Sequence, residues 1–234
     1  MEEEAVLSFG QRGSLRGTGA CDSRIHCVRE RLGMNTPAFP LTLADRLTIR
    51  HFRKAVPQDA RTRFDHSLDA IVAAEPSFVT DAATHTHTII GACAVSLYRA
   101  QVAQGCDRPR AKAKVRAPMM TLWKRSMRSM MWATSLFSRD VFEALRRYTK
   151  TRGANAFGAG FEIDYCETGD GFVSEVKTCG YLRFLERHDA RDLLDLFCEW
   201  DRIWIDALPK SVRFHRPPTQ AQGAATCRFE FRRR

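Results

Sequence analysis

The apolar residues of the first half of the chain recur at helical spacing, which predicts three helices. The first begins near Leu41 and ends before Pro57, and the second spans residues 59–74. The third, at about residues 80–104, is apolar on most sides. We therefore expect a long, central, buried helix there, with Gly105 as its C-cap.

A basic block follows at residues 108–128, where Lys and Arg occupy eight positions and acidic residues none. In its second half, Met and Trp are interleaved with the basic residues at intervals of three and four, which predicts an amphipathic helix. A further helix is expected from an N-cap at Ser138 to Tyr148, with a basic last turn and Gly153 beyond it.

Beyond Gly153 the apolar period changes from helical to two, which indicates strands. Alternation over residues 157–165, the turn signal Gly169-Asp170-Gly171 and the apolar positions of residues 172–179 together predict a β-hairpin. The remaining elements expected are one long helix and two strands, at residues 181–208, 212–220 and 225–232.

The separation of the strands from the run of helices predicts the α+β class. We expect an N-terminal helical bundle packed on a small antiparallel four-stranded sheet, with a long helix between its two hairpins. A single domain would span residues 41–234, with a helical part at 41–152 and a sheet-bearing part at 153–234. The Gly-, Ser- and Arg-rich residues 1–40 are expected to form a flexible N-terminal extension.

The charge of the chain is basic but locally concentrated. There are 37 Lys and Arg against 27 Asp and Glu, a formal net charge of +10, and the basic block accounts for much of the excess. Nucleic acid is therefore not the expected partner of the domain, and no docking motif for it is present. No apolar run approaches the ~20 residues of a membrane span. The start, Met-Glu-Glu-Glu, is acidic, so we expect a cytoplasmic protein with no membrane contact.

The thiols and carboxylates of the C-terminal third are the first candidate for chemistry. None of the eight cysteines forms a Cys-x-x-Cys pair, which predicts free thiols. Cys198 and Asp201 are three residues apart, so on a helix they share a face that can point toward strands with Cys179 and Cys227. Three interpretations stay open: a nucleophilic thiol beside a carboxylate, a soft-metal site, and simple packing.

Other polar residues offer weaker signals. His85 and His87 lie on different faces of a helix, which disfavours a shared metal site, but His87 is a candidate general base if it faces a cavity. The alternative for both is a solvated or capping role. Arg216 suits bidentate binding of a carboxylate, or else a surface salt bridge. The basic block fits an anionic surface, or a solvated face whose Met and Trp pack on the core.

The C-terminal third also contains motifs in a characteristic order. They are Cys179-Gly180-Tyr181, Phe197-Cys198-Glu199-Trp200-Asp201, Phe214-His215-Arg216-Pro217-Pro218-Thr219, Gly223 and Cys227-Arg228-Phe229-Glu230-Phe231. In order and spacing the series resembles the L-2-amino-thiazoline-4-carboxylic acid hydrolase family, best over residues 157–232. Pro217-Pro218 and Ala225 depart from the residues usual in that family, so the resemblance implies a framework rather than one substrate.

The resemblance implies hydrolysis of a small carboxylate-bearing cyclic amidine or isothiourea. In the family's named reaction, water adds to the carbon between sulfur and nitrogen of L-2-amino-thiazoline-4-carboxylate and gives N-carbamoyl-L-cysteine. By this resemblance Cys179 or Cys198 is a nucleophile or a site-forming thiol, and Asp201 orients the amidinium or activates water. His87 is a proton shuttle if its helix lines the same pocket.

The resemblance also implies which residues bind the substrate. Arg216 would clamp the carboxylate, and Tyr181 and Cys227 would complete the binding site. The expected partner is a small carboxylate, and neither a cofactor nor a metal is assigned. Two alternatives remain: a non-catalytic small-ligand-binding or regulatory domain of the vinyl-reductase type, and a protein that binds anionic surfaces through the basic block.

Overall fold

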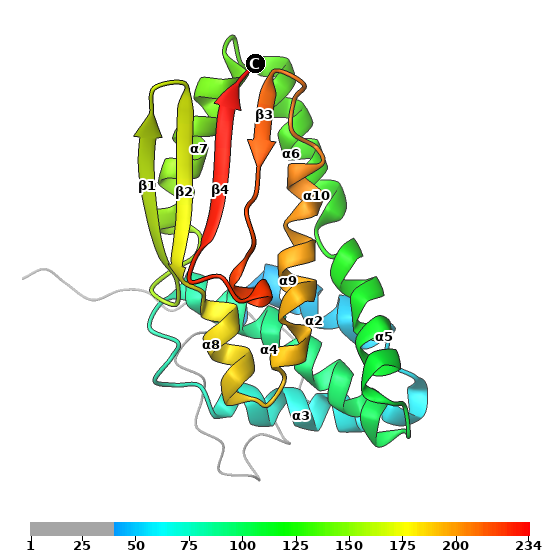
Figure 1. Ribbon diagram of the computed structural model, residues 1–234. Helices are drawn as coiled ribbons and strands as arrows, with labels where there is room; N and C mark the ends of the chain where they lie inside the picture. Colours follow the sequence, from blue (N-terminus) through cyan, green and yellow to red (C-terminus); the bar gives the residue numbers. More distant parts are fainter. Residues whose placement is uncertain (1–39) are drawn as a thin grey trace, which may run out of the picture. The chain divides into compact units, whose positions relative to one another are not determined.

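The computed structural model describes residues 40–234, except for the side chains of residues 152–155. The expected extension, residues 1–40, lies outside this part of the chain apart from Pro40. Helices come first and one antiparallel sheet follows, which confirms the predicted α+β class. Figure 1 shows α2, α3, α4 and α5 gathered at one end of the sheet, and α7 beside β1 and β2.

The element bounds follow the sequence pattern in its first half. The helices before the sheet are α2 (Leu43–Lys54), α3 (Arg61–Ala73), α4 (Ala82–Ala103), α5 (Arg108–Thr121), α6 (Lys124–Phe137) and α7 (Val141–Asn155). The strands are β1 (Glu162–Thr168), β2 (Gly171–Thr178), β3 (Val212–His215) and β4 (Cys227–Arg233). Between β2 and β3 lie α8 (Gly180–Arg187), α9 (Leu194–Trp200) and α10 (Arg202–Ile205).

Helix α4 is the centre of the bundle, as its sequence predicts. Fifteen of its 22 residues are buried, which is the condition of a helix that is apolar on every side. The helices α2, α3, α5 and α8 pack around it. Gly91 permits the contact with α8, because a Cβ atom there would lie 2.6 Å from the ring of Phe184. The C-terminal Gly105 adopts φ +85°, as expected of a glycine that follows a helix.

The start of α4 also holds the loop that leads into the sheet. Asp81 caps the helix by accepting a hydrogen bond from the Thr84 backbone N–H at 2.8 Å, and it accepts another from the Ala159 N–H at 2.8 Å. The Gly160 N–H donates to the Thr84 hydroxyl at 3.1 Å. Gly158 has φ +70°, and a Cβ atom there would collide with the Asp81 carboxylate, so glycine is required.

The sheet has the strand order β1-β2-β4-β3, and every neighbouring pair is antiparallel. The predicted hairpin forms β1 and β2 around Gly169-Asp170. Alternation places Phe172 and Phe231 on the face toward the helices, where their rings stack with centroids 4.6 Å apart. These two rings, with Met131, Phe142, Leu145 and Val212, form a second core, separate from the core around α4.

The expected long helix between the hairpins is broken into three. After α8 the backbone turns at Asp189, a non-glycine residue with φ +50°, and Ala190 and Leu193 are buried at the turn. The burial of these two side chains at the corner between α8 and α9 therefore outweighs the preference of the sequence for one continuous helix. The last two strands are also not joined by a tight hairpin: β3 ends at His215, and a 3-10 turn at Gln220–Gln222 precedes β4.

Two helix boundaries also differ from expectation. Ser138 ends α6 instead of starting α7, and Asp140 accepts a hydrogen bond from the Glu143 N–H at 3.1 Å at the start of α7. Helix α7 then continues past Gly153 to Asn155. The first half of the basic block is helical too, as α5. Trp123, with φ +58°, turns the chain between α5 and α6.

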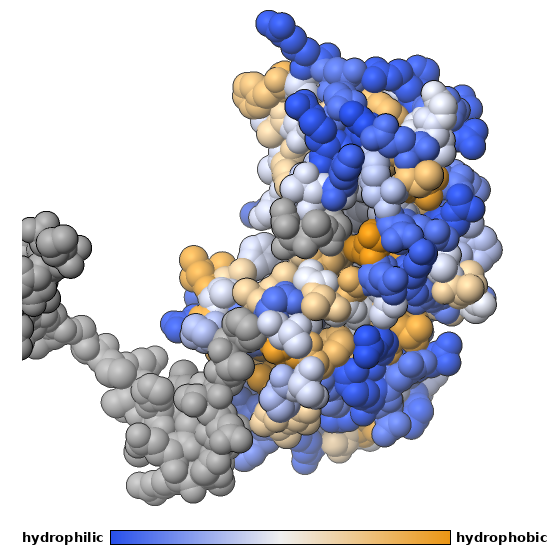
Figure 2. Space-filling model, turned by 90° about the vertical axis from the view of Figure 1, so that its left-hand side faces the viewer, coloured by the Kyte–Doolittle hydropathy of each residue, from blue (hydrophilic) through white to orange (hydrophobic). Residues whose placement is uncertain are grey.

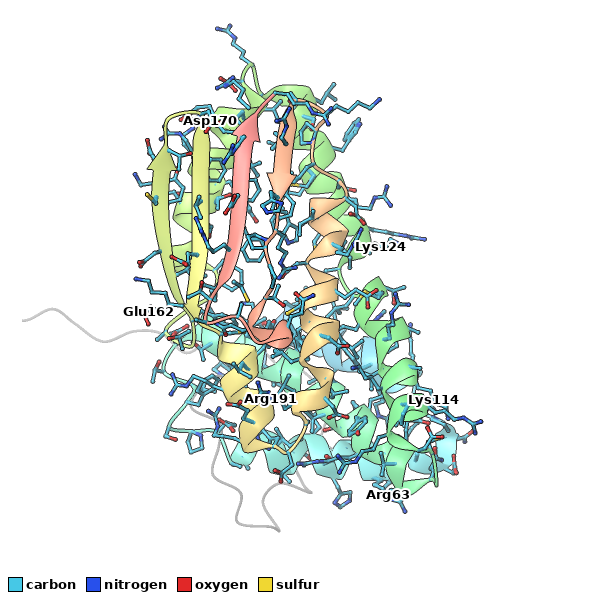
Figure 3. The ribbon with its side chains drawn as sticks, viewed as in Figure 1. Arg63, Lys114, Lys124, Glu162, Asp170 and Arg191 are labelled. Atoms are coloured by element: carbon cyan, nitrogen blue, oxygen red, sulfur yellow. The ribbon has the colours of Figure 1, made fainter. Side chains whose placement is uncertain are left out.

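The basic block is partly neutralised by acidic residues of α9. Lys112 pairs with Asp195 at 2.7 Å, and Arg116 pairs with Glu199. Lys124, by contrast, points away from the ribbon in Figure 3. Figure 2 shows hydrophilic residues over most of the face it views, with separate hydrophobic areas between them. Among residues 40–234, no helix is long and apolar enough to cross a membrane.

Asp45 joins α2 to α4 through a buried carboxylate. It accepts hydrogen bonds from the backbone N–H and the hydroxyl of Thr42 at 2.9 and 2.8 Å, and it faces Nδ1 of His85 at 3.5 Å. Burial acts to raise the pKa of this carboxyl, but hydrogen bonds from His85, Thr42 and Thr86 outweigh burial and lower it to about 2. The charged carboxylate therefore stabilises the folded state at pH values above its ordinary pKa.

We predict that Asp45→Asn lowers the free energy of unfolding by about 2 kcal/mol at pH 7, since each pKa unit corresponds to about 1.4 kcal/mol. The difference from the wild type should shrink as the pH falls from about 4 to 2, because protonation of Asp45 then removes the same charge. Urea unfolding followed by circular dichroism at pH 7 and pH 3 measures both values. An equal loss at the two pH values would contradict the assignment.

Candidate active site

A cavity of about 110 Å³ lies between the inner face of the sheet and helices α6, α7 and α9. Its floor is formed by side chains of β1, β2 and β4, including Ile163, Val176 and Phe229. Met131 and Leu145 line it from α6 and α7, and the walls are mostly apolar. Such a concave, mostly apolar space with a few polar groups is typical of a small-molecule site.

Six of the seven residues proposed from the sequence line this one cavity. They are Cys179, Tyr181, Cys198, Asp201, Arg216 and Cys227. The seventh, His87, lies behind Tyr181 and accepts a hydrogen bond from its hydroxyl at 2.7 Å. His85 lies apart from them, buried beside Asp45.

Secondary structure explains why residues so distant in sequence meet. Cys179 is the N-cap residue of α8, directly after β2, and Cys227 begins β4, the strand beside β2. Cys198 lies on α9 and Asp201 directly follows this helix, so their spacing puts both on one side. Arg216 directly follows β3, which is an edge strand of the sheet and the first strand after α9 and α10 in the chain.

Burial keeps the three thiols protonated. It raises the pKa of Cys179 to about 12, although the backbone N–H groups of Leu182 and Tyr181 at the start of α8 act in the opposite direction. Burial likewise raises the pKa of Cys198 to about 11, against hydrogen bonding to Thr219 and the charge of Arg216. The pKa of Cys227 is also raised by burial. A resting thiolate is therefore a minor species at neutral pH in this cavity.

Arg216 and Asp201 form an ion pair at the cavity wall. The Arg216 Nη2 group donates to Asp201 Oδ2 at 3.0 Å, and Nη1 donates to the Cys198 carbonyl at 2.8 Å. The guanidinium also lies over the ring of Phe229, with 4.5 Å between Cζ and the ring centroid. The carboxylate clamp proposed from the sequence thus already holds a carboxylate of this chain, and a ligand carboxylate would have to share or replace it.

The hydrogen bonds of His87 define its tautomer when the ring is neutral. Its Nε2 atom lies 2.9 Å from the Ala156 carbonyl oxygen, which can only accept, so Nε2 carries the proton. Nδ1 then accepts from the Tyr181 hydroxyl at 2.7 Å. The ring stacks on Phe157 with centroids 5.3 Å apart and meets Phe161 and Tyr181 edge to face. The Tyr181 hydroxyl proton is therefore directed to His87. Toward a ligand, the Tyr181 hydroxyl oxygen acts as a hydrogen-bond acceptor.

A soft-metal site, one of the open interpretations of the sequence, receives no support within residues 40–234. No group of three or more His, Cys, Asp or Glu side chains in that part of the chain is arranged to hold a metal ion. Cys227 instead accepts a hydrogen bond from the Gln220 N–H at 3.2 Å.

The wall that α6, α7 and α10 provide was not predicted from the sequence. Met130, Met131 and Leu145 line the cavity, and so does Trp204. The interleaved Met and Trp of α6 did signal an amphipathic helix. That pattern identifies an apolar face, but it does not distinguish a face that fills a core from one that borders a cavity.

One family model matches the chain, that of L-2-amino-thiazoline-4-carboxylic acid hydrolase, over residues 86–231. This is more than half of the 234 residues. The chain belongs to this family. The match contains His87 and all six residues that line the cavity among those proposed from the sequence. No curated protein and no solved structure matches the chain. The family name points to a hydrolase, and the resemblance inferred from the motifs is confirmed.

The raised thiol pKa values give a labelling prediction. Exposed Cys166 should react with iodoacetamide quickly, and Cys179 and Cys198 should react much more slowly at pH 7. Since both pKa values lie near 11 or 12, the labelling rates of these two residues should rise about tenfold per pH unit between pH 7 and 10. Peptide mass spectrometry resolves each thiol. Labelling of Cys179 or Cys198 that reaches a plateau near pH 8 would contradict the protonated state.

The His87 tautomer is testable without a substrate. In ¹⁵N–¹H long-range correlation spectra at a pH where the ring is neutral, His87 should show the pattern of a proton on Nε2. Tyr181→Phe should shift the Nδ1 resonance, because it removes the donor, and leave the proton on Nε2, where Ala156 still accepts. The signal is assigned by its loss in His87→Gln. A dominant form with the proton on Nδ1 would contradict the hydrogen bonds assigned to Ala156 and Tyr181.

Proposed function

We propose that the chain hydrolyses a small carboxylate-bearing cyclic amidine or isothiourea in this cavity, in a ring opening of the L-2-amino-thiazoline-4-carboxylate type. The observation that carries the proposal is the convergence of Asp201, Arg216 and three thiols on one mostly apolar space. These residues come from the segment that matches the family model. The proposal names a substrate class and leaves the substituents of the ring open.

Charge complementarity favours such a ligand. Asp201 and Arg216 are the charged side chains among the described residues that line the cavity, and they neutralise each other. A ligand with a single net charge would leave one of these groups without compensation in a partly buried site, which is costly. A cyclic amidine with a carboxylate is a zwitterion, so its amidinium can pair with Asp201 while its carboxylate pairs with Arg216.

Attack by water is the route that the electrostatics favour. A thiol whose pKa is about 11 or 12 must lose its proton before it can attack, whereas a carboxylate beside the amidine carbon can accept a proton from water. Water then adds to the carbon between sulfur and nitrogen, and the carbon–sulfur bond breaks. The oxygen becomes the ureido carbonyl, and the released sulfur takes up a proton. Cys179, Cys198 and Cys227 act as neutral walls in this scheme.

A second candidate is a ligand-binding domain without turnover. It is favoured by the same protonated thiols and by the existing bond between Arg216 and Asp201, because neither observation requires catalysis. In that case the cavity would bind the same zwitterion and release it unchanged. Binding and product formation must therefore be measured on one preparation.

The test is incubation of the full chain with L-2-amino-thiazoline-4-carboxylate and related cyclic ureas, with ring opening followed by mass and binding by calorimetry. We expect turnover, and a loss of about 100-fold or more in kcat for Asp201→Asn, since positioned acid–base groups typically contribute that much. Cys179→Ser and Cys198→Ser should retain activity within about tenfold if water attacks directly.

Asp206→Asn is the matched control, because Asp206 follows α10, is well exposed and pairs with Arg202 at 3.6 Å. It should leave kcat unchanged, and circular dichroism checks that both aspartate variants fold. Binding without any product would favour the ligand-binding domain. Abolished turnover in Cys198→Ser or Cys179→Ser, with binding retained, would replace the water route by a thiol nucleophile.

A further inference from the structure

The cavity combines a charged end with an apolar wall. Asp201 and Arg216 provide the charged end, at the side of α9 and the chain after β3. The apolar wall begins beside it with Trp204 of α10, whose indole N–H donates to Asp201 at 3.4 Å. Helices α6 and α7 extend this wall with Met130, Met131 and Leu145. A ring with only a carboxylate and an amidine is polar around most of its edge. Its recognition accounts for the charged end and leaves the apolar wall without a partner.

From this we infer that the natural ligand carries an apolar substituent in addition to its zwitterionic head, and that α6 and α7 bind this substituent. The inference rests on the proposed function for the identity of the head. Transfer of the substituent from water to the apolar wall supplies binding free energy that the head alone cannot, because an ion pair exchanged for another ion pair gains little.

The side chains of the wall suit a substituent of variable shape. Met130 and Met131 are unbranched and flexible, so they adapt to different apolar groups. Met130 is 38% exposed, whereas Met131 is only 4% exposed and belongs to the second core, and both line the cavity.

A second hollow lies next to the cavity. It has a volume of about 320 Å³ and shares Thr149, Phe161, Ile163 and Ser174 with the cavity, so the two adjoin along α7 and β1. Lys150 and Tyr165 line the second hollow but not the cavity, and the Lys150 ammonium lies 5.5 Å from the Tyr165 ring centroid. Both hollows thus lie against the same segment of α7 and β1.

The experiment compares L-2-amino-thiazoline-4-carboxylate with the same ring carrying a butyl group next to sulfur. A fully buried methylene contributes about 0.8 kcal/mol, or roughly fourfold in affinity, so even partial burial of butyl predicts at least tenfold tighter binding. Calorimetry gives the Kd of each compound. Equal or weaker binding of the butyl compound would overturn the inference and leave the proposed function intact.

Norleucine and alanine form a second matched pair that needs no ring. Both are zwitterions, and only norleucine carries the apolar chain. If neither thiazoline binds, the proposed function has failed, but tighter binding of norleucine than of alanine would still support an apolar subsite. No difference between the two amino acids in that case would overturn the inference as well.

A pair of variants on one helix locates the subsite. Met130→Ala should reduce the affinity ratio of butyl to unsubstituted ligand about threefold or more, because Met130 lines the cavity. Leu136→Ala is the control: Leu136 lies on the same helix, is 57% exposed and does not line the cavity. It should leave the ratio within twofold. The same change in both variants would show that α6 does not bind the substituent.

Discussion

A helix that is apolar on every side must be covered on every side, and α4 imposes this constraint on residues 40–234. Four helices surround α4. The four strands pair with one another in a separate sheet, and the bundle lies at one end of it. The inner face of that sheet then needs a cover of its own, which α6 and α7 provide. The cavity lies where the two cores meet, since its lining includes Leu194 and Phe197 of one core and Met131 and Phe231 of the other.

The same burial determines the chemistry of the corner. Three thiols gather there, and a count of cysteines suggests reactive sulfur. Burial raises their pKa values instead, so the ionised groups are Asp201 and Arg216. Their bond makes the cavity electrically neutral, and this neutrality sets which ligands can bind without leaving a charge unpaired. Proximity of residue types is thus a poor guide to reactivity unless the environment of each group is known.

Local patterns in the sequence predicted much of the fold. The period of α4, the glycine after it and the turn at Gly169-Asp170 are properties of neighbouring residues, and each was found where expected. The break at Asp189 was not predictable, because it serves the burial of Ala190 and Leu193 against partners far along the chain. The boundary at Ser138 failed for a related reason: Asp140, two residues later, provides an equally good cap.

The candidate site shows the same division. The motifs of the C-terminal third identified the residues that line the charged end. Each of these motifs lies at the end of a strand or on α9, so local spacing was enough to find them. The residues that α6 places in the cavity depend on the angle at which this helix packs against the sheet. No spacing within the sequence indicates that angle. The hydrogen bond from Tyr181 to His87 joins residues 94 positions apart, and no pattern in the sequence indicated it.

Asp81 serves two elements at once. One carboxylate oxygen caps α4, and the other accepts a hydrogen bond from the Ala159 N–H. The same loop begins at Ala156, whose carbonyl oxygen accepts from His87. Fraying of the first turn of α4 would therefore release this loop and the aromatic rings beside His87 in the same event. The end of the buried central helix and the loop beside His87 thus depend on one carboxylate, so a local opening at either place would weaken the other.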